Sequence, residues 1–181
     1  MRSDGAGPPA RRQRAERFRS EWFPQDLPRR RAVAVPHALK IYTRPDHGKE
    51  PLFLHTPDEV RAWFAAWRDA SPAGSVDLAT FYLAGDDWGP ELNAGLDGDK
   101  GVLHHSGDDD TSYGFHSHAP EGSNPDEVVY YFFAADTPFP PHSEIPVAAV
   151  ESAVLEFMST GLRPTCVHWQ AWVPGTGHVP V

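Results

Sequence analysis

The sequence predicts an α+β domain in which two helices pack on a mostly antiparallel sheet of about five to seven strands. Two segments have the apolar spacing of one-sided helices, and several short runs rich in β-branched and aromatic residues accompany them. Turns rich in Gly, Pro and Asp join these runs, which is typical of antiparallel pairing. Separate groups of strands and helices, without regular βαβ alternation, indicate the α+β class.

The ordered part of the chain is expected to start with a strand. Residues 32–43 form a β-branched run that Pro36 interrupts, which predicts an edge strand or two short strands because proline cannot donate a ladder hydrogen bond. Residues 51–56 predict a second short strand that leads directly into a helix.

The first helix has a clear start signal. Thr56 can serve as N-cap, Pro57 as the first helical residue, and Glu59 completes a capping box. Four apolar residues then share one face, and the helix should end near Asp69. They are Val60, Trp63, Phe64 and Trp67.

The middle of the chain is predicted to be β-rich. Residues 76–85 read as one strand, and residues 91–106 as two strands about the turn Asp97–Gly101. Residues 112–119 and 127–136 predict two more, the second apolar enough to be central in the sheet.

A second helix and a last strand follow. Pro146 can open the helix, and Gly161 is where the chain should leave it through a left-handed cap. Pro164 prevents continuation of the helix, and residues 165–172 alternate as a strand. On this strand Cys166 is expected to be a small buried residue and not a nucleophile.

Charge divides the chain in two. Residues 1–31 carry nine arginines against four acidic residues, a net charge of +5, and are expected to form a flexible basic arm. Residues 32–181 carry seven Lys and Arg against 21 acidic residues, a net charge of −14, and are expected to form a single domain. Such a domain should repel nucleic acid and attract a basic partner.

Acidic and aromatic residues gather between positions 86 and 113. If they lie on adjacent strands and turns, they form one negative edge with aromatic anchors for a protein partner. The alternative places Trp88 and Phe115 in the core and the acids in solvated turns. The candidate binding residues are Asp86, Asp87, Trp88, Glu91, Asp97, Asp99, Asp108, Asp109, Asp110 and Tyr113.

Histidines provide a competing interpretation. A His-x-His pair on one strand can supply two ligands of a metal site, and His104 and His105 lie nearby in the sequence. The alternative function is therefore a small metal-dependent enzyme that uses His104, His105, His116 and His118. The chain has no Gly-x-Ser-x-Gly elbow, P-loop or zinc-deaminase signature, so we expect no enzyme and no cofactor.

Membrane insertion and secretion are not expected. No apolar run approaches the ~20 residues that a membrane span needs. The first thirty residues lack an apolar signal segment, and the single cysteine fits a reducing cytoplasm.

Residues 139–170 resemble the closing segment of the Imm immunity proteins that accompany deaminase-type toxins in bacterial polymorphic toxin systems. Members typically have a proline-led helix that ends in Phe-x-x-Thr-Gly-x-Arg-Pro, then a strand with a tryptophan. The matching residues are Pro146, Phe157, Thr160, Gly161, Arg163, Pro164 and Trp169. The resemblance covers about residues 52–172, more loosely in the middle, and not the arm.

The resemblance implies a cytoplasmic antitoxin that binds a cognate toxin, as a monomer or weak homodimer, without catalysis. A deaminase toxin acts on nucleic acid, so an acidic surface could cover its basic groove. The motif residues are expected to be mainly structural, with Trp169 packed under the helix. Arg163 is expected to hold the last helical carbonyls or to pair with a carboxylate such as Asp136. A stand-alone interaction domain is a further alternative.

Overall fold

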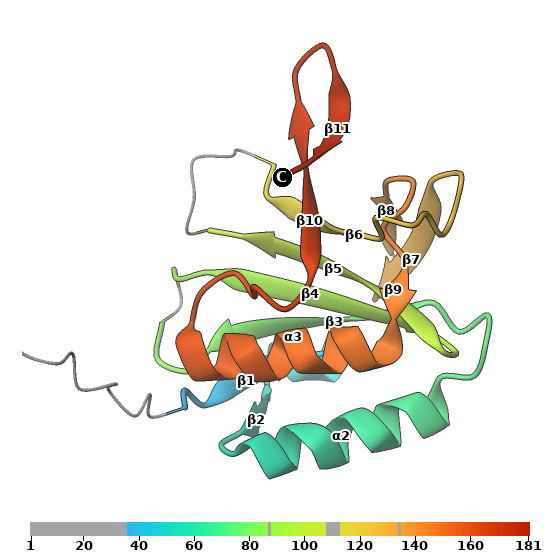
Figure 1. Ribbon diagram of the computed structural model, residues 1–181. Helices are drawn as coiled ribbons and strands as arrows, with labels where there is room; N and C mark the ends of the chain where they lie inside the picture. Colours follow the sequence, from blue (N-terminus) through green and yellow to red (C-terminus); the bar gives the residue numbers. More distant parts are fainter. Residues whose placement is uncertain (1–35, 87, 108–112, 134) are drawn as a thin grey trace, which may run out of the picture. The chain divides into compact units, whose positions relative to one another are not determined.

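The computed structural model describes residues 36–86, 88–107, 113–133 and 135–181. Within these ranges, eleven strands form a single sheet and two α-helices cover one of its faces (Figure 1). The α+β class is therefore confirmed, whereas the predicted count of five to seven strands is too low. The predicted arm, residues 1–31, lies outside the described residues.

Eight of the strands lie side by side along the sheet, and every neighbouring pair among them is antiparallel. Their order is β11 (Gly177–Pro180), β10 (His168–Val173), β6 (Phe115–His118), β5 (Lys100–Ser106), β4 (Glu91–Asp97), β3 (Asp77–Leu83), β1 (Leu39–Tyr42) and β2 (Leu52–Leu54).

The first strand is not an edge strand, which corrects the prediction for residues 32–43. β1 pairs with β2 on one side and with β3 on the other. Pro36 lies three residues before the strand begins, so its missing N–H takes nothing from the ladder. The edge belongs to β2, which is followed by the predicted helix.

The two α-helices begin and end close to the predicted residues. In α2 (Pro57–Ala70), the Thr56 hydroxyl accepts a hydrogen bond from the Glu59 N–H at 3.2 Å. The Glu59 carboxylate reaches one residue further back than in a standard capping box and accepts from the His55 N–H at 2.6 Å. α3 (Val147–Thr160) ends at Gly161, whose φ of 69° is the predicted left-handed cap.

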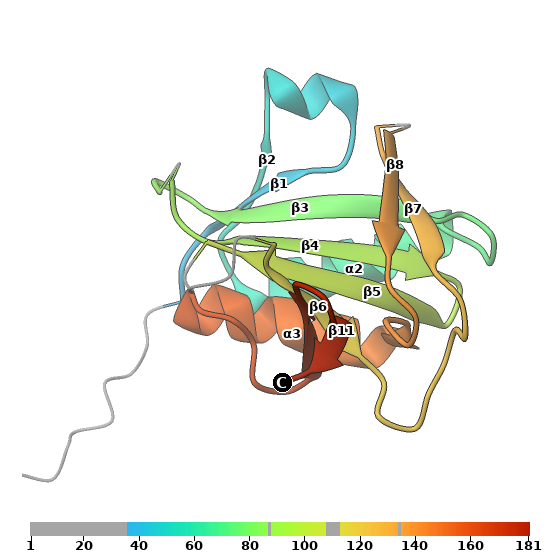
Figure 2. The same ribbon diagram turned by 90° about the horizontal axis from the view of Figure 1, so that it is seen from above.

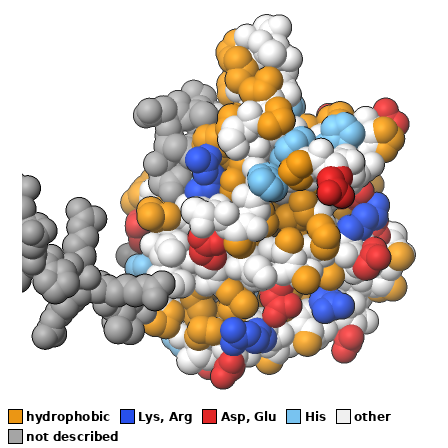
Figure 3. Space-filling view, in the orientation of Figure 1, with side chains coloured by type: hydrophobic (Ala, Val, Ile, Leu, Met, Phe, Trp, Pro, Cys, Tyr) orange, Lys and Arg blue, Asp and Glu red, His pale blue; other side chains and the backbone are white. Residues whose placement is uncertain are grey.

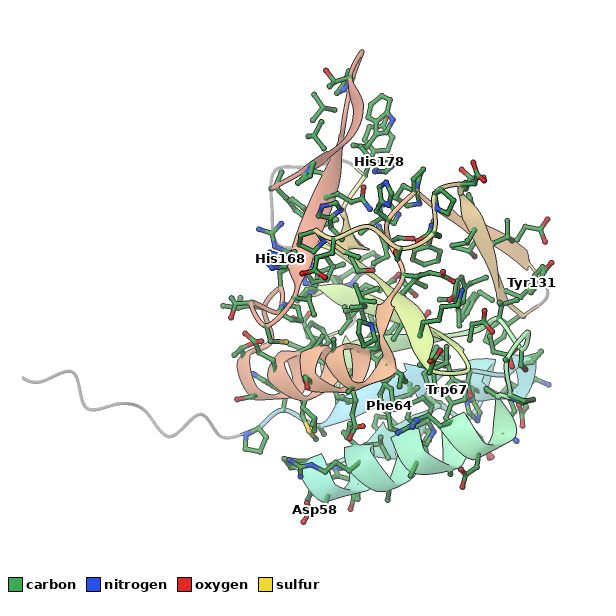
Figure 4. All side chains as sticks on the ribbon, turned by 45° about the vertical axis from the view of Figure 1, so that its right-hand side comes forward. Asp58, Phe64, Trp67, Tyr131, His168 and His178 are labelled. Atoms are coloured by element: carbon green, nitrogen blue, oxygen red, sulfur yellow. The ribbon has the colours of Figure 1, made fainter. Side chains whose placement is uncertain are left out.

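Both helices bury apolar side chains against the same face of the sheet, and their side chains form the main core. Phe64 and Phe157 are fully buried there. Trp63 packs edge-on against Phe81 of β3 with ring centroids 5.6 Å apart. Figure 4 shows Phe64 and Trp67 directed from α2 toward the sheet and α3.

A β-hairpin crosses the opposite face of the sheet. It consists of β7 (Val128–Phe132) and β8 (Ala135–Phe139), and it lies on the side away from α3 (Figure 2). Among its described residues, it pairs with the main sheet through one parallel bridge, Asp77 with Tyr131. The prediction of one central strand over residues 127–136 is therefore wrong, because the apolar side chains serve to pack the hairpin across the sheet. A two-residue strand, β9 (Ile145–Pro146), pairs with β5.

The hairpin has its own small core, formed by Leu78, Val102, Tyr130 and Phe139. Gly95 of β4 makes room for it, because a Cβ at this position would lie 2.5 Å from the Tyr130 ring. The sheet thus has one face covered by helices and one partly covered face.

Candidate partner-binding surface

The loop between β3 and β4 presents the most exposed large apolar side chain among the described residues. Trp88 is 96% exposed, which excludes the alternative that places it in the core. The carboxylate of the exposed Asp86 accepts a hydrogen bond from the Trp88 N–H at 3.3 Å. The exposed indole is therefore carried by a loop whose backbone is fixed by an acidic side chain.

A second loop reaches the same end of the β4–β5 pair. Gly107, just after β5, lies against the Gly89–Pro90 backbone of the first loop. Tyr113, where the described chain resumes, is 59% exposed, and its ring lies 4.6 Å from the Trp172 ring of β10. The backbone oxygen of Tyr113 lies 3.1 Å from His104 Nε2. We call Asp86, Trp88, Glu91 and Tyr113 the loop-end surface.

Glu91 connects this surface to the partly covered face of the sheet. Its carboxylate accepts hydrogen bonds from the Tyr82 hydroxyl and, at 2.6 Å, from the Asn93 amide. Asn93 Oδ1 in turn accepts from the Thr80 hydroxyl at 2.6 Å. Burial, followed by the bond to Glu91, raises the pKa of Tyr82 well above its usual value, so its hydroxyl keeps its proton.

Thr80, Tyr82, Glu91 and Asn93 form the floor of a groove of about 580 Å³ between the sheet and the β7–β8 hairpin. The Lys40 ammonium lies 5.9 Å from the Tyr42 ring centroid and 5.7 Å from that of Tyr82, within cation–π range. The hairpin contributes Phe132, Phe133 and Thr137 to the opposite wall. The groove combines aromatic walls with one acid and one base, which suits a polypeptide surface of mixed character.

Two predicted acidic residues lie at the other end of β4. Asp97 accepts a hydrogen bond from the Gly74 N–H at 2.5 Å and lies 3.7 Å from the Lys100 ammonium. Asp99 contributes its backbone oxygen to the Val147 N–H at 2.9 Å. Six residue steps of about 3.3 Å separate Asp97 from Glu91, or ~20 Å. Those predicted acids that the structure describes thus occupy two ends of the β4–β5 pair and not one continuous edge.

Four of the predicted acids, Asp87, Asp108, Asp109 and Asp110, lie outside the described residues. On the helix-covered face, acidic side chains are scattered among apolar and basic ones, as Figure 3 shows.

Comparison with known families decides the affiliation of the chain. The family model described as immunity protein Imm1 matches residues 48–171, which is more than half of the sequence. The chain belongs to the Imm1 family. No curated protein matches it.

The Imm1 match includes all seven residues of the motif that suggested an immunity protein, and several of these residues have structural roles. The Gly161 N–H donates to the Phe157 oxygen at 2.8 Å, and a Cβ on Gly161 would lie 2.9 Å from Leu83. Trp169 is 5% exposed within the main core, as predicted, and its Nε1 donates to the Pro164 oxygen at 2.7 Å. Pro146 is the N-cap residue of α3, and Thr160 is its last residue.

Arg163 stacks on an aromatic ring, and its predicted contact with the last helical carbonyls or a carboxylate remains a prediction. Its guanidinium carbon lies 3.6 Å from the centroid of the Phe115 ring, a close cation–π stack. Asp136, the suggested carboxylate, lies on the β7–β8 hairpin and faces Tyr131 across the two strands. Arg163 thus covers an aromatic ring of the core.

Glu156 is a motif neighbour that the sequence did not single out. Its carboxylate accepts three hydrogen bonds from the loop after α3, namely from the Thr165 N–H at 2.9 Å, the Thr165 hydroxyl at 2.7 Å and the Cys166 N–H at 3.0 Å. Cys166 is exposed and not buried, which corrects the prediction. Partial desolvation of the thiol, together with the hydrogen bond to Glu156 and the charge of Glu156, raises its pKa to about 11.

The four histidines of the metal-enzyme alternative do not form one cluster. His105 is fully buried on the helix side, with its ring 6.0 Å from Phe157. His104 and His116 face each other on the other side with ring centroids 4.8 Å apart, and His178 lies 5.1 Å from His116. Burial, then the neighbouring His104 and His178, lowers the pKa of His116 to about 3.

No group of three or more His, Cys, Asp or Glu side chains within the described ranges is arranged to hold a metal ion. His118 pairs instead with His168 across β6 and β10.

Among the described residues no helix is long and apolar enough to cross a membrane.

The sequence missed the groove residues. Lys40, Tyr82 and Asn93 belong to three separate strands, so only strand pairing brings them together. Each of these residues alternates with buried neighbours along its own strand, which indicates the face on which it lies. This pattern does not indicate which residue of another strand lies beside it.

Proposed function

We propose that this Imm1-family chain is an immunity protein that binds a cognate toxin domain and blocks it. It acts in the bacterial cytoplasm as a monomer or weak homodimer, forms a one-to-one complex, and needs neither catalysis nor a cofactor. The domain of residues 32–181 carries this function.

The observation that carries the proposal beyond the family is Trp88. A tryptophan that is 96% exposed leaves a large apolar area in water, and such residues recur at the energetic centres of protein interfaces. Tyr113, also exposed, adds a second aromatic group from a neighbouring loop. The loop-end surface therefore offers anchors for a protein partner.

The acidic character of the domain suggests the nature of that partner. A net charge of −14 over residues 32–181 favours association with a basic surface. A toxin that acts on nucleic acid, such as a deaminase, needs a basic groove to hold phosphates. We propose that the loop-end surface, together with Asp87, Asp108, Asp109 and Asp110, covers such a groove.

The test is titration of the purified chain with the catalytically inactivated toxin domain from the gene immediately upstream. We expect one-to-one binding that Trp88→Ala weakens at least tenfold, because truncation of a central aromatic anchor typically removes this much affinity. Arg68→Ala is the control, since Arg68 is an exposed residue of α2, on the helix-covered face of the sheet. Lack of binding by the wild-type chain would refute the function.

Charge reversal tests the acidic part of the proposal. Replacing Asp86, Asp108, Asp109 and Asp110 by Lys should slow association and remove much of its salt dependence. Asp69→Lys, on the exposed side of α2, should change both only slightly. Equal effects of the two changes would contradict an acidic contact surface. Inhibition of the active toxin in an assay on single-stranded nucleic acid would identify the chemistry of the toxin.

A further inference from the structure

The β7–β8 hairpin exposes an apolar side chain at every second position from Val129 to Phe133. Val129, Tyr131 and Phe133 are 37%, 42% and 38% exposed, whereas Tyr130 between them is fully buried. Figure 4 shows Tyr131 pointing away from the body of the domain. We call Val129, Tyr131 and Phe133 the hairpin stripe.

Two carboxylates flank the centre of this stripe. Tyr131 pairs with Asp77 of β3 on one side and with Asp136 of β8 on the other, so the three form one row across three strands. Bridge partners in a sheet direct their side chains to the same face, with Cβ atoms about 4.5–5.5 Å apart. Asp77 and Asp136 are both exposed. The row thus places an aromatic ring between two negative charges at the surface.

Phe133 at the end of the stripe has an unusual backbone. Its φ is 52°, a left-handed conformation that costs a bulky L-residue about 1–2 kcal/mol. Its ring stacks on Phe132 with centroids 4.0 Å apart and remains partly in solvent. Asn or Gly would adopt this backbone conformation with less strain.

We propose that the hairpin stripe is a second docking surface for the same toxin, with a Lys or Arg side chain of the toxin over Tyr131, between Asp77 and Asp136. This inference rests on the proposed function and adds to the loop-end surface. The cation would form ion pairs with both carboxylates and a cation–π contact with the ring, while Val129 and Phe133 would exclude water around it.

Charge complementarity selects a basic partner over a second copy of this domain. Asp77 of β3 and Asp136 of β8 are exposed at this edge, and each copy would bring a domain charge of −14. Two such stripes would therefore oppose carboxylates to carboxylates. A toxin surface that binds phosphates offers the complementary sign.

One partner can reach both surfaces. The hairpin pairs with β3 at Asp77, and the loop-end surface follows the other end of β3 at Leu83. Six steps of about 3.3 Å separate these ends, or ~20 Å, which fits within an interface of about 800 Å² per partner. The groove lined by Phe133, Tyr82 and Glu91 extends between them.

The first experiment measures toxin binding of Asp77→Asn/Asp136→Asn and of Tyr131→Ser, with Asp69→Asn as control. We expect each to weaken binding by five- to fiftyfold at low salt. The loss for the Asn pair should shrink as salt rises, because it removes a Coulombic contact.

Phe133→Asn separates binding from folding. If the phenyl group serves the partner, this variant melts at the wild-type temperature or higher and still binds the toxin at least fivefold more weakly. A variant with lower stability and unchanged affinity would overturn the inference, since Phe133 would then be a folding residue.

The outcomes distinguish this inference from the proposed function. Wild-type affinity in all three stripe variants, with loss in Trp88→Ala, overturns the second surface and leaves the immunity function intact. Failure of the wild-type chain to bind the toxin refutes both. Self-association that Tyr131→Ser abolishes, with toxin affinity unchanged, would show that the stripe serves a second copy and would also overturn the inference.

Discussion

At the scale of single residues, Glu156 shows how one carboxylate organises the segment after α3. It gathers two backbone N–H groups and one hydroxyl from Thr165 and Cys166. Burial raises the pKa of Glu156, but the hydrogen bonds from Thr165 and Cys166 lower it by more, so the net shift is downward. The charged form is therefore the one that holds this loop.

We predict that Glu156→Gln destabilises the chain by about 1–2 kcal/mol at neutral pH, because charge-assisted hydrogen bonds become neutral or are lost. Glu151→Gln on the same helix is the control. Urea unfolding of the three proteins measures the difference.

The same variant should reveal a pH dependence. A carboxyl with a depressed pKa in the folded state stabilises above its unfolded pKa of about 4.5 and loses this contribution as pH falls through the folded value. The gap between wild type and Glu156→Gln should thus be full at neutral pH and close progressively below about pH 4.5. A constant gap down to about pH 3 would contradict this role of the charge.

At the scale of elements, the hairpin depends on a glycine in a strand that it crosses. Gly95 has no Cβ, and this allows the Tyr130 ring to lie directly on β4. The Tyr130 hydroxyl then donates to Glu144 at 3.2 Å, and Glu144 also accepts from the Lys100 ammonium at 2.7 Å. The contact thus connects the hairpin to the segment before α3.

We predict that Gly95→Ala destabilises the chain by about 1–3 kcal/mol, because the added methyl group would lie 2.5 Å from Tyr130 and 2.9 Å from Val102. Gly48→Ala is a matched control, since nothing lies within 4 Å of its Cβ position. Thermal unfolding distinguishes them, and equal melting temperatures would show that the hairpin adapts without cost.

Elements with a local signal could be predicted from the sequence, and the others could not. Thr56, Glu59 and Gly161 fix helix ends through contacts within a few residues, so their signals are complete in the sequence. The β7–β8 turn at Phe133 contains no Gly, Asn or Asp to announce it. The two-residue strand β9 exists because the distant strand β5 pairs with it.

At the scale of the whole molecule, the sheet separates two cores of very different size. Within the described ranges, the helix-side core comprises twenty-two buried residues and the hairpin core four. Since local opening costs less where fewer apolar contacts are lost, the hairpin should open before the rest of the sheet.

Native-state hydrogen exchange tests this expectation. The amide of Tyr130 in the hairpin should exchange at least tenfold faster than that of Leu103 in β5, although both side chains are fully buried. Equal protection of the two amides would mean that the domain opens only as one unit.

The candidate surface was predictable in composition but not in arrangement. The sequence identified Trp88 and Tyr113 as possible anchors, yet their exposure depends on loops that only tertiary structure positions. Asp97 and Glu91 were grouped because they are close in the sequence. They lie at opposite ends of β4, however, because the strand between them is extended. Tyr131 was not predicted as a surface residue, because a continuous apolar run does not indicate which side of the strand is buried.

The lone exposed thiol of Cys166 gives the chain a built-in attachment point for a fluorophore. It lies at the hollow beside α3, across the sheet from the groove and the hairpin stripe, and no second cysteine competes for the reagent. Because its pKa is about 11, a maleimide will react slowly at neutral pH and faster in mildly alkaline buffer. A dye at this position would report toxin capture without altering either proposed contact surface.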